Sequence, residues 1–344
     1  MCSFVVFSST KLESEEFDKA LKKVFHRGPD NKYSAIENGL YWGFNRLSIM
    51  DLSSNGNQPF KYNSCELVCN GEIYNYLSLK ELLSTEYKFH SNSDCEVLIP
   101  LYYKYGIEIM CKMLDAEFAL VLYDSDTNSI MAARDPMGIR PMFYGYTKED
   151  HKISFASEAK ALIDYCKDIM PFPPGHYYKD GEFICYNDLS ESKFINNDDF
   201  NTIFTNIRTK LISAVEKRLH ADAPIGYLLS GGLDSSLVCS IAQKIINKPI
   251  KTFSIGMETD PIDLKYAKQA AEFLGTDHTE VIITKDDVLN SLEEVIYHLE
   301  TFDITTIRAS IGMYLLCKYI HENTDLKVIL TGEVSDELFG YKYT

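Results

Sequence analysis

Cys2 is the first residue of this sequence whose type and position could carry out chemistry. It follows Met1, and a small second residue usually permits removal of the initiator methionine. Cys2 would then carry a free α-amine with a pKa of about 7.7–8.0, which can take the thiol proton directly or through water. The position predicts an N-terminal nucleophile for acyl transfer, although many proteins begin Met-Cys by chance.

Four further residues of the first half could complete a site that hydrolyses the amide of glutamine. Asn70 and the N–H of Gly71 could form an oxyanion hole, because glycine lets the backbone approach closely. Arg46 could pair with an α-carboxylate in a bidentate manner, and Asp94 could hold an α-ammonium group. Each also has a structural interpretation: a turn for Asn-Gly, a surface ion pair for Arg46 and a helix cap for Asp94. Only the combination points to catalysis.

The second half contains a loop suited to binding phosphate groups. Residues 230–236 read Ser-Gly-Gly-Leu-Asp-Ser-Ser between a predicted strand and a predicted helix. Backbone N–H groups and the positive end of a helix dipole would face the phosphates there, and no lysine follows as in a Walker A loop. Asp234 would repel phosphate unless it holds Mg²⁺. A second acidic loop, residues 332–337, could bring Asp336 to the same metal. Simple turns are the structural alternative.

The predicted secondary structure around these motifs differs between the two halves of the sequence. Up to about residue 165 the sequence predicts short strands and turns with one or two helices, and residues 190–199 read as a linker. Beyond it, strands alternate with helices, which indicates βαβ units and a parallel sheet. Because the carboxyl ends of neighbouring parallel strands share one crevice, the two acidic loops are expected to meet there. The predicted elements after the linker are helix 203–219, strand 225–229, helix 237–246, strand 250–256, helix 264–274, strand 279–284, helices 288–299 and 310–321, and strand 327–330.

Composition excludes several classes of protein. The 344 residues include 34 Lys and Arg against 50 Asp and Glu, a net charge of -16, which disfavours general binding to nucleic acid or to anionic membranes. No segment approaches the ~18 apolar residues of a membrane span, and the start of the sequence lacks the basic region of a secretory signal. Nine scattered cysteines without a CxxC motif predict reduced thiols and a cytoplasmic location.

The first half resembles the class II glutamine amidotransferase domains, which are N-terminal-nucleophile hydrolases with an αββα core. The resemblance covers essentially residues 1–185 and implies a domain over residues 2–190. It also implies that Cys2 attacks the glutamine amide, that Asn70 and Gly71 form the oxyanion hole, and that Arg46, Glu72 and Asp94 bind the ends of glutamine. The motifs that carry it, in order, are MCS, HRGPD, RLSI, NGEIYN, SDCE, RDPMGIRP and FASEAKAL, the last running from Phe155 to Leu162.

The second half resembles the synthetase domain of glutamine-hydrolysing asparagine synthetases, an α/β doubly wound domain of the ATP-pyrophosphatase type. The residues that carry this are the 230–236 loop, the stretch 295–310 and LTGEVSDELFG at 330–340. The resemblance implies a domain over residues 200–344, incomplete at its C-terminus, that makes asparagine from aspartate, ATP and glutamine-derived ammonia. It implies Mg²⁺ at Asp234 and Asp336, an acid/base role for Glu333, and aspartate near Thr306 and Arg308. The implied ATP-binding residues are Leu228, Ser230, Gly231, Gly232, Asp234, Ser235, Ser236, Ile255, Thr331 and Gly332.

Two departures from the family pattern leave alternatives open. Val334 stands where the family loop has Gly, which matters if a positive φ is needed there. The family also continues well beyond residue 344, so the sheet is expected to end without a covering helix and to expose apolar surface. A stand-alone glutaminase, or an inactive or regulatory fragment, is therefore the alternative function. A homodimer and a partner that supplies the missing half are the assemblies left open.

Overall fold

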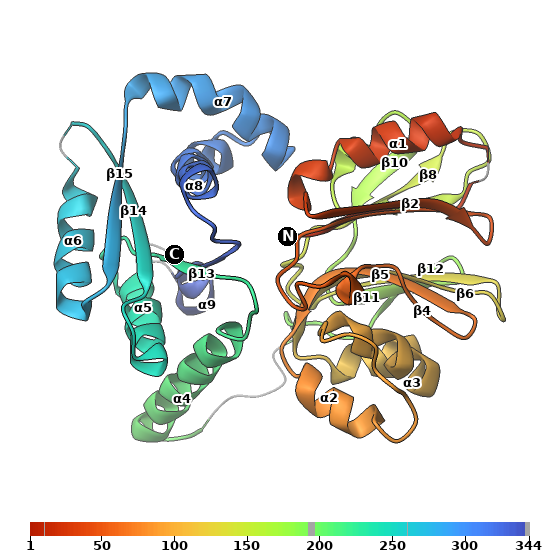
Figure 1. Cartoon of the computed structure of the whole chain (residues 1–344), viewed down its shortest axis with the longest axis horizontal. Helices are drawn as coiled ribbons and strands as arrows, with labels where there is room; N and C mark the ends of the chain where they lie inside the picture. The colour runs from red at the N-terminus through yellow and green to blue at the C-terminus, as the bar shows by residue number, and fades with distance from the viewer. Residues whose placement is uncertain (10, 192–196, 260, 341–344) are drawn as a thin grey trace. The chain divides into compact units, whose positions relative to one another are not determined.

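The computed structural model describes residues 1–9, 11–191, 197–259 and 261–340. The chain forms two compact units, Met1–Asn196 and Asn197–Thr344, which are drawn in Figure 1. The predicted linker at 190–199 lies partly outside the described residues. Among the described residues, every helix is too short or too polar to cross a membrane.

Two antiparallel six-stranded sheets form the centre of the first unit. The order of the first sheet is β10-β8-β9-β1-β3-β2, and that of the second is β12-β11-β7-β6-β5-β4. The strands of the first sheet are β1 (Ser3–Phe7), β2 (Asn31–Glu37), β3 (Leu40–Arg46), β8 (Phe143–Thr147), β9 (Ile153–Ala156) and β10 (Cys166–Pro171). Those of the second are β4 (Phe60–Tyr62), β5 (Cys65–Ile73), β6 (Ala116–Asp124), β7 (Ser129–Arg134), β11 (His176–Lys179) and β12 (Glu182–Cys185).

Helices cover the outer faces of both sheets, as Figure 1 shows. Helix α1 (Ser14–Lys22) packs on the first sheet, and α2 (Tyr76–Leu83) and α3 (Leu98–Met113) pack on the second. The alternation of β1 explains the layers: Val5 and Phe7 face α1, whereas Phe4 and Val6 face the second sheet. Both faces of β1 are thus buried, and the predicted αββα core is confirmed. Short 3₁₀ helices lie at Phe25–Arg27, Ser54–Gly56, Cys95–Val97 and Ala159–Ala161.

The second unit is a parallel sheet in the order β15-β14-β13-β16, with helices on both faces. One core lies between the sheet and α4, α5 and α6, and a second lies between the sheet and α8, on which α7 packs. This confirms the doubly wound α/β prediction. The elements are α4 (Phe200–Arg218), β13 (Ile225–Leu228), α5 (Leu233–Ile246), β14 (Lys251–Met257), α6 (Ile262–Leu274), β15 (Asp277–Ile283), α7 (Lys285–Leu299), α8 (Ile304–Asn323), β16 (Val328–Leu330) and α9 (Ser335–Phe339).

Several predicted boundaries were wrong, and backbone hydrogen bonding explains the differences. Helix α8 begins six residues before the predicted start at Ser310, because the Asp303 side chain accepts a hydrogen bond from the Thr306 N–H and caps it. Helix α5 begins at Leu233 rather than Leu237. Strand β5 continues through Ile73 because it pairs with β6 along its whole length. The segment 70–72 therefore lies inside a strand, not in the turn that was considered for it.

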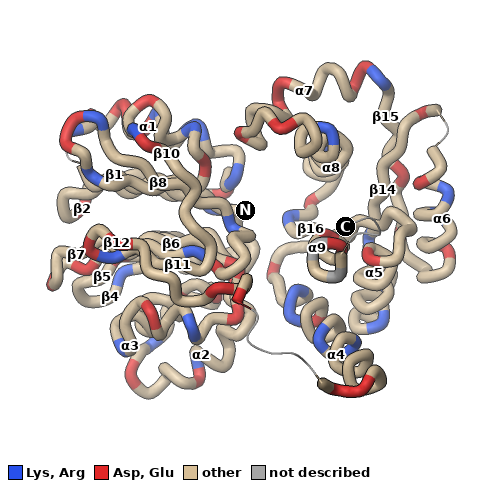
Figure 2. The backbone as a smooth tube through the Cα atoms, turned by 180° about the vertical axis from the view of Figure 1, so that it is seen from behind, with Lys and Arg blue, Asp and Glu red and all other residues tan. Residues whose placement is uncertain are grey.

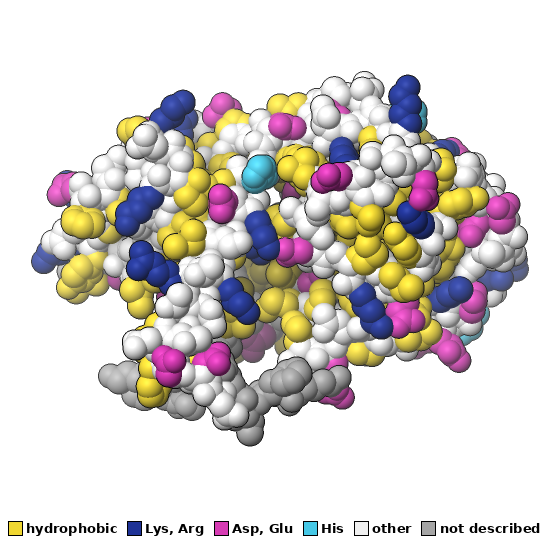
Figure 3. Space-filling model, turned by 90° about the horizontal axis from the view of Figure 1, so that it is seen from below, with side chains coloured by type: hydrophobic (Ala, Val, Ile, Leu, Met, Phe, Trp, Pro, Cys, Tyr) yellow, Lys and Arg dark blue, Asp and Glu magenta, His cyan; other side chains and the backbone are white. Residues whose placement is uncertain are grey.

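Apolar side chains are exposed on α4 and around the start of α8 in the second unit. Phe302 is 96% exposed and Ile304 80%, and Phe200 and Phe204 of α4 are also exposed. The short helix α9 follows β16, but among the described residues it contributes to neither core of the sheet, so it does not contradict the prediction that no covering helix follows the last strand. The face in Figure 3 shows hydrophobic side chains among charged ones. In Figure 2 the basic residues of the first unit are scattered among acidic ones, in keeping with the acidic composition.

Candidate functional site

The Cys2 thiol lies where the start of β1 meets the end of β3. It donates a hydrogen bond to the carbonyl oxygen of Leu47 at 3.5 Å and accepts one from the Leu47 N–H at 3.4 Å. Burial raises the pKa of the Cys2 thiol, and the adjacent N-terminal amine and the Leu47 hydrogen bond offset this only in part. The group is therefore protonated at neutral pH and needs a base to become a nucleophile.

The amino terminus beside Cys2 has the properties of such a base. In this chain the amine belongs to Met1, and burial lowers its pKa to about 5, with the charges of Arg27 and Arg140 acting in the same direction. An amine in these surroundings is neutral at pH 7 and can accept a proton. If Met1 is removed, the α-amine of Cys2 takes over the position next to the thiol.

Asn70 and Gly71 lie on β5, a strand that contacts β1 across the two sheets. The Asn70 side chain is only 2% exposed, and its Nδ2 has no hydrogen-bond partner among the described residues. A buried donor without a partner costs about 1–3 kcal/mol, so its retention points to a ligand that completes it. Gly71 has no room for a side chain, because a Cβ would lie 2.7 Å from the Glu117 carbonyl oxygen on β6.

Two buried acidic side chains, Glu72 and Asp94, lie next to each other beyond Asn70 and Gly71. Burial and the neighbouring Asp94 carboxyl raise the pKa of Glu72 to about 8, against the opposing charge of Arg140. Asp94 is 4% exposed, and burial raises its pKa although its Oδ2 accepts a hydrogen bond from the Ile73 N–H at 2.6 Å. Asp94 makes no capping hydrogen bond to its 3₁₀ helix, so the helix-cap alternative is wrong. The structure therefore brings two desolvated carboxyls together near Cys2, where a cationic group would be favoured.

Arg46 is buried at the end of β3, but its guanidinium already has partners. Nη1 donates to the Ser53 carbonyl oxygen and to Asn57 Oδ1, both at 2.7 Å. Nη2 donates to the carbonyl oxygens of Met50, at 3.1 Å, and of Asp51. The surface ion-pair alternative is therefore wrong. A bidentate contact with an α-carboxylate through both terminal nitrogens would require the 50–57 loop to release at least two of these bonds.

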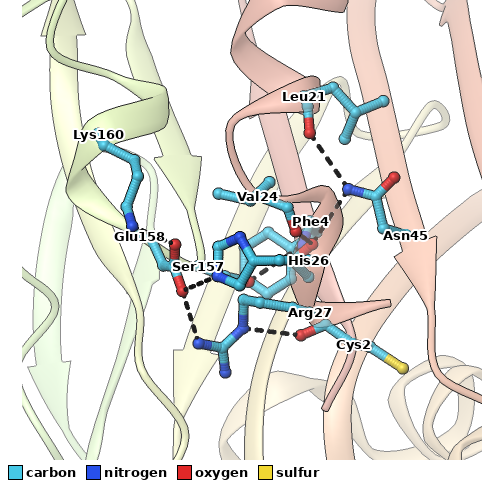
Figure 4. Close-up of polar contacts among 11 residues, drawn as sticks. Cys2, Phe4, Leu21, Val24, His26, Arg27, Asn45, Ser157, Glu158 and Lys160 are labelled. Atoms are coloured by element: carbon cyan, nitrogen blue, oxygen red, sulfur yellow. Dashed lines mark hydrogen bonds and ion pairs between the residues drawn. The ribbon is translucent and has the colours of Figure 1, made fainter. Parts of the chain in front are cut away.

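A buried ionic cluster of Arg27, His26, Glu158 and Lys160 contacts Cys2 through Arg27, and the sequence alone assigned it no role. Arg27 Nε donates to the Cys2 carbonyl oxygen at 3.2 Å, and Arg27 Nη1 donates to Glu158 Oε1 at 2.8 Å (Figure 4). His26 and Lys160 also contact the Glu158 carboxyl. These residues belong to the HRGPD and FASEAKAL motifs, so the sequence marked each of them as notable. It could not show that the two motifs contact each other, because they are more than 120 residues apart.

The second unit contains a cavity of about 450 Å³ at the carboxyl ends of its strands. It lies where β13 and β16 are adjacent, which is the point at which the strand order reverses and where open α/β sheets bind ligands. Of the predicted residues, ten line it: Leu228, Ser230, Gly232, Asp234, Ser235, Ile255, Thr331, Gly332, Glu333 and Asp336.

The loop after β13 is held in shape by its own serines and glycines. Ser230 Oγ and Ser235 Oγ are 2.9 Å apart, and the Gly232 N–H donates to Ser230 Oγ. Gly231 has φ +80°, and a Cβ on it would meet the α6 backbone at Tyr266, 2.4 Å away. Gly231 and Ser236 do not line the cavity themselves. Gly231 instead lets the loop pass close to α6, which leaves the first turn of α5 facing the cavity.

Asp234 and Asp336 lie on the same cavity although they follow different strands. Mg²⁺ binds through one or two carboxylates together with phosphate oxygens, so this pair fits an ion that a nucleotide helps to hold. Within the described residues, three or more metal-binding side chains do not gather at any point. The pair therefore fits a metal that arrives with its phosphate ligands better than one held by protein alone.

Comparison with known proteins decides the family. Residues 1–177 match the family model described as "Glutamine amidotransferase domain", and residues 206–344 match the one described as "Asparagine synthase". A probable glutamine-hydrolysing asparagine synthetase from Acanthamoeba polyphaga mimivirus is 40% identical over 99% of this chain and 67% of that protein. The chain belongs to the glutamine-hydrolysing asparagine synthetase family.

Other relatives give the same picture, and they are longer than this chain. A probable asparagine synthetase from Schizosaccharomyces pombe is 42% identical over 99% of this chain and 65% of its own length. The asparagine synthetase of Zea mays is 42% identical over 93% of this chain and 56% of its length. The chain thus spans between about half and two thirds of these relatives. Among solved structures, a Bacillus subtilis glutamine PRPP amidotransferase complexed with ADP and GMP matches with a TM-score of 0.46 at 16% identity, covering 81% of this chain and 65% of that one.

Two residues expected near aspartate lie away from the cavity of this family member. Thr306 and Arg308 are exposed in the first turns of α8, and neither lines the cavity. The face of α8 that does line it consists of Ala309, Gly312, Met313 and Leu316. The predicted helix start at Ser310 had left Thr306 and Arg308 on a loop.

Two polar lining residues were missed from the sequence. Asp263 at the start of α6 lines the cavity, as does Ser254 of β14, which is hydrogen-bonded to His278 Nε2 at 3.0 Å. Neither belongs to one of the sequence motifs named above. Asp263 follows the carboxyl end of β14, which was the available signal for it, whereas Ser254 lies in the middle of that strand.

Val334 occupies a strained backbone conformation beside the predicted acid/base Glu333. Its φ of +78° lies in the left-handed region, which is rare for a β-branched residue. The departure from the family glycine noted in the sequence is thus a real conformational cost. Strain of this kind is of the order of 1–3 kcal/mol.

Proposed function

We propose that this chain hydrolyses glutamine at Cys2 and supplies the ammonia for ATP-dependent conversion of aspartate to asparagine. The observation that carries the proposal is the Cys2 thiol held at Leu47 beside the amino terminus, together with the buried Asn70 Nδ2, which has no hydrogen-bond partner among the described residues. A self-activated nucleophile and an unfilled oxyanion donor are the two requirements of amide hydrolysis. Family membership supports the substrate, since the relatives named above are called glutamine-hydrolysing.

The first half-reaction uses the residues around Cys2. The terminal amine takes the thiol proton, and the sulfur attacks the glutamine side-chain carbonyl carbon. Asn70 Nδ2 and the Gly71 N–H stabilise the oxyanion, the C–N bond breaks, and ammonia leaves with the proton. Water then hydrolyses the thioester to glutamate. Glu72 and Asp94 hold the α-ammonium of glutamine, and Arg46 holds its α-carboxylate after rearrangement of the 50–57 loop.

The second half-reaction uses the cavity of the second unit. The 230–236 loop binds the ATP phosphates, and Leu228 and Ile255 offer backbone contacts to adenine, with Thr331 and Gly332 completing the wall. Asp234 and Asp336 would hold Mg²⁺, which neutralises phosphate charge when bound. The aspartate carboxylate attacks the α-phosphorus and releases pyrophosphate. Ammonia then displaces AMP, with Glu333 accepting a proton.

The cellular setting is also a proposal. All nine cysteines are free in the structure, which is consistent with a reducing, cytoplasmic compartment. The partners that this function needs are small molecules: glutamine, aspartate and ATP.

One assay on the wild-type chain and on Cys2→Ala tests the function. The chain is incubated with glutamine, aspartate and Mg-ATP, and glutamate, pyrophosphate and asparagine are each measured. We expect glutamate to disappear from the products of Cys2→Ala while ammonium chloride still supports asparagine formation by that variant. Glutamate without pyrophosphate or asparagine would leave a glutaminase only, and glutamate release by Cys2→Ala would refute the role of Cys2.

A further inference from the structure

Glu158 is a buried acidic side chain that is linked to Cys2 through Arg27, and the proposed function gives it no role. It is 4% exposed and is the second residue after β9. Its Oε1 lies 2.8 Å from Arg27 Nη1 and 3.1 Å from His26 Nε2, and its Oε2 lies 3.0 Å from Lys160 Nζ (Figure 4). Although burial opposes ionisation, the hydrogen bond from His26 and the charge of Arg27 lower the pKa of Glu158 to about 2. Glu158 is thus a carboxylate at any working pH.

Arg27 connects the Glu158 cluster to Cys2. Arg27 bonds to Glu158 with Nη1 and to the Cys2 carbonyl oxygen with Nε, so a single guanidinium bridges the two residues. The Arg27 side chain is only 12% exposed, and Glu158 is the acidic group with which it forms an ion pair in the described structure. Without that carboxylate, a buried guanidinium would lose its counter-charge, which favours its movement toward water and away from Cys2.

The residue before Glu158 holds the same strand at a second point. The Phe4 N–H donates to Ser157 Oγ at 3.0 Å, and the Ser157 N–H donates to the Phe4 carbonyl oxygen at 3.0 Å. The pair 157–158 thus fixes β1 on both sides of Ser3, immediately after the nucleophile. Because Cys2 lies at the free end of β1, these contacts determine where its sulfur lies relative to β5.

We propose that Glu158 is a positioning residue for the Cys2 nucleophile, acting through Arg27. The inference rests on the proposed glutaminase function. Glu158 touches neither substrate nor sulfur, and its carboxylate keeps Arg27 bonded to the Cys2 carbonyl. Loss of that bond lets the thiol move away from the Leu47 N–H and the terminal amine. Misplacement of a reacting group by about 1 Å can cost about 100-fold in rate.

Steady-state kinetics of glutamine hydrolysis by Glu158→Gln provide the first test. Gln keeps the shape but removes the charge, so we expect kcat to fall roughly 10- to 100-fold with KM changed by less than about threefold. Glu66→Gln is the matched control, because Glu66 is equally buried and pairs with Lys61 at the other end of β5. Its kcat and KM should equal those of the wild type. Equal kcat in both variants would overturn the proposal, as would an effect on KM alone.

Alkylation of Cys2 by iodoacetamide, followed by peptide mass spectrometry, provides a readout that does not need glutamine. In Glu158→Gln we expect slower alkylation of Cys2 at pH 7.5 and a pH profile shifted to higher pH. The exposed Cys185 and Cys317 serve as internal references whose rates should not change. An unchanged Cys2 profile would contradict the proposal. If wild-type protein releases no glutamate, the proposed function fails, while the alkylation profile still decides the role of Glu158.

Two more variants separate positioning from folding. Lys160→Met removes the ion pair with Glu158 Oε2 but leaves the Arg27 bonds in place, and it should retain kcat within about threefold. Glu158→Asp keeps the charge but withdraws it from Arg27 by one methylene, so an intermediate kcat is expected. If Glu158→Gln does not fold, as judged by circular dichroism, Glu158→Asp carries the test: wild-type kcat and alkylation in that folded variant would refute the proposal.

Discussion

Gly332 lies directly against the backbone of Ser235: a Cβ on Gly332 would stand 2.6 Å from the Ser235 nitrogen. Gly332 follows β16 and Ser235 lies in the first turn of α5, so this contact joins the two loops that form the cavity. Real Cβ atoms do not approach a backbone nitrogen so closely. The spacing between the phosphate loop and the acidic loop therefore depends on the absence of a side chain at residue 332.

The first prediction follows from this contact. Gly332→Ala should push the acidic loop away from α5 and weaken Mg-ATP binding at least about tenfold, since the two halves of the cavity separate. Titration calorimetry with Mg-ATP measures the affinity, and circular dichroism checks that the variant is folded. Unchanged affinity in folded protein would show that this contact does not shape the nucleotide site.

Val334→Gly should stabilise the second unit by about 1 kcal/mol. The strain of a β-branched residue at positive φ, about 1–3 kcal/mol, is relieved, while the flexible glycine costs part of that gain in the unfolded chain. Val334→Ala keeps a Cβ at the same φ and should gain less. Urea denaturation measures the change, and a Gly variant less stable than wild type would mean that the surroundings do not strain Val334.

Glutamine binding should tighten as the pH rises through about 8. The pKa of Glu72 is raised to about 8, so most of this carboxyl is protonated at pH 7 and gains its charge above pH 8. The α-ammonium of glutamine prefers the ionised form, and KM should fall roughly fivefold to tenfold between pH 7 and pH 8.5. Steady-state kinetics over this range test it. Glu72→Gln should flatten the dependence, and a pH-independent wild-type KM would contradict the assignment.

Asn70→Ala should lose activity without losing stability. The Asn70 Nδ2 has no partner to lose in the described structure, but an oxyanion donor is worth roughly 100- to 1,000-fold in kcat. Glutaminase kinetics and thermal unfolding are measured on the same preparation. A variant that is much less stable, with activity lost only in proportion to its unfolded fraction, would favour a structural role for Asn70.

Stability should depend on pH through Glu66 in the first unit. Burial raises the pKa of Glu66 to about 7, and the nearby Lys61 offsets this only in part. Its protonated form is favoured in the folded state, so stability present below about pH 4.5 is lost as the pH rises through 7. Glu66→Gln should therefore be about 2 kcal/mol more stable than wild type at pH 8 and equal to it near pH 4.5. Urea denaturation at the two pH values measures this, and equal stabilities at pH 8 would show that the buried charge is already compensated.

Local patterns predicted much of the fold and the position of the cavity in the second unit. The βαβ alternation after residue 200 indicated the parallel sheet, and strand-end loops placed Asp234 and Asp336 in one crevice, as the structure shows. Local patterns failed where hydrogen bonding between distant segments decided the outcome. Asn-Gly usually marks a turn, but pairing with β6 holds Asn70 and Gly71 in a strand.

The sequence by itself determined which reactive groups exist and which loops follow which strands, because residue type and local spacing are properties of the chain alone. Only the tertiary structure decided which groups meet. Arg27 and Glu158 are 131 residues apart, and Arg46 binds its own neighbouring loop rather than pointing freely outward. The physical reason is that a buried charge must find a counter-charge or hydrogen-bond partners in the folded state, and sheet register, not sequence distance, determines which partner is within reach.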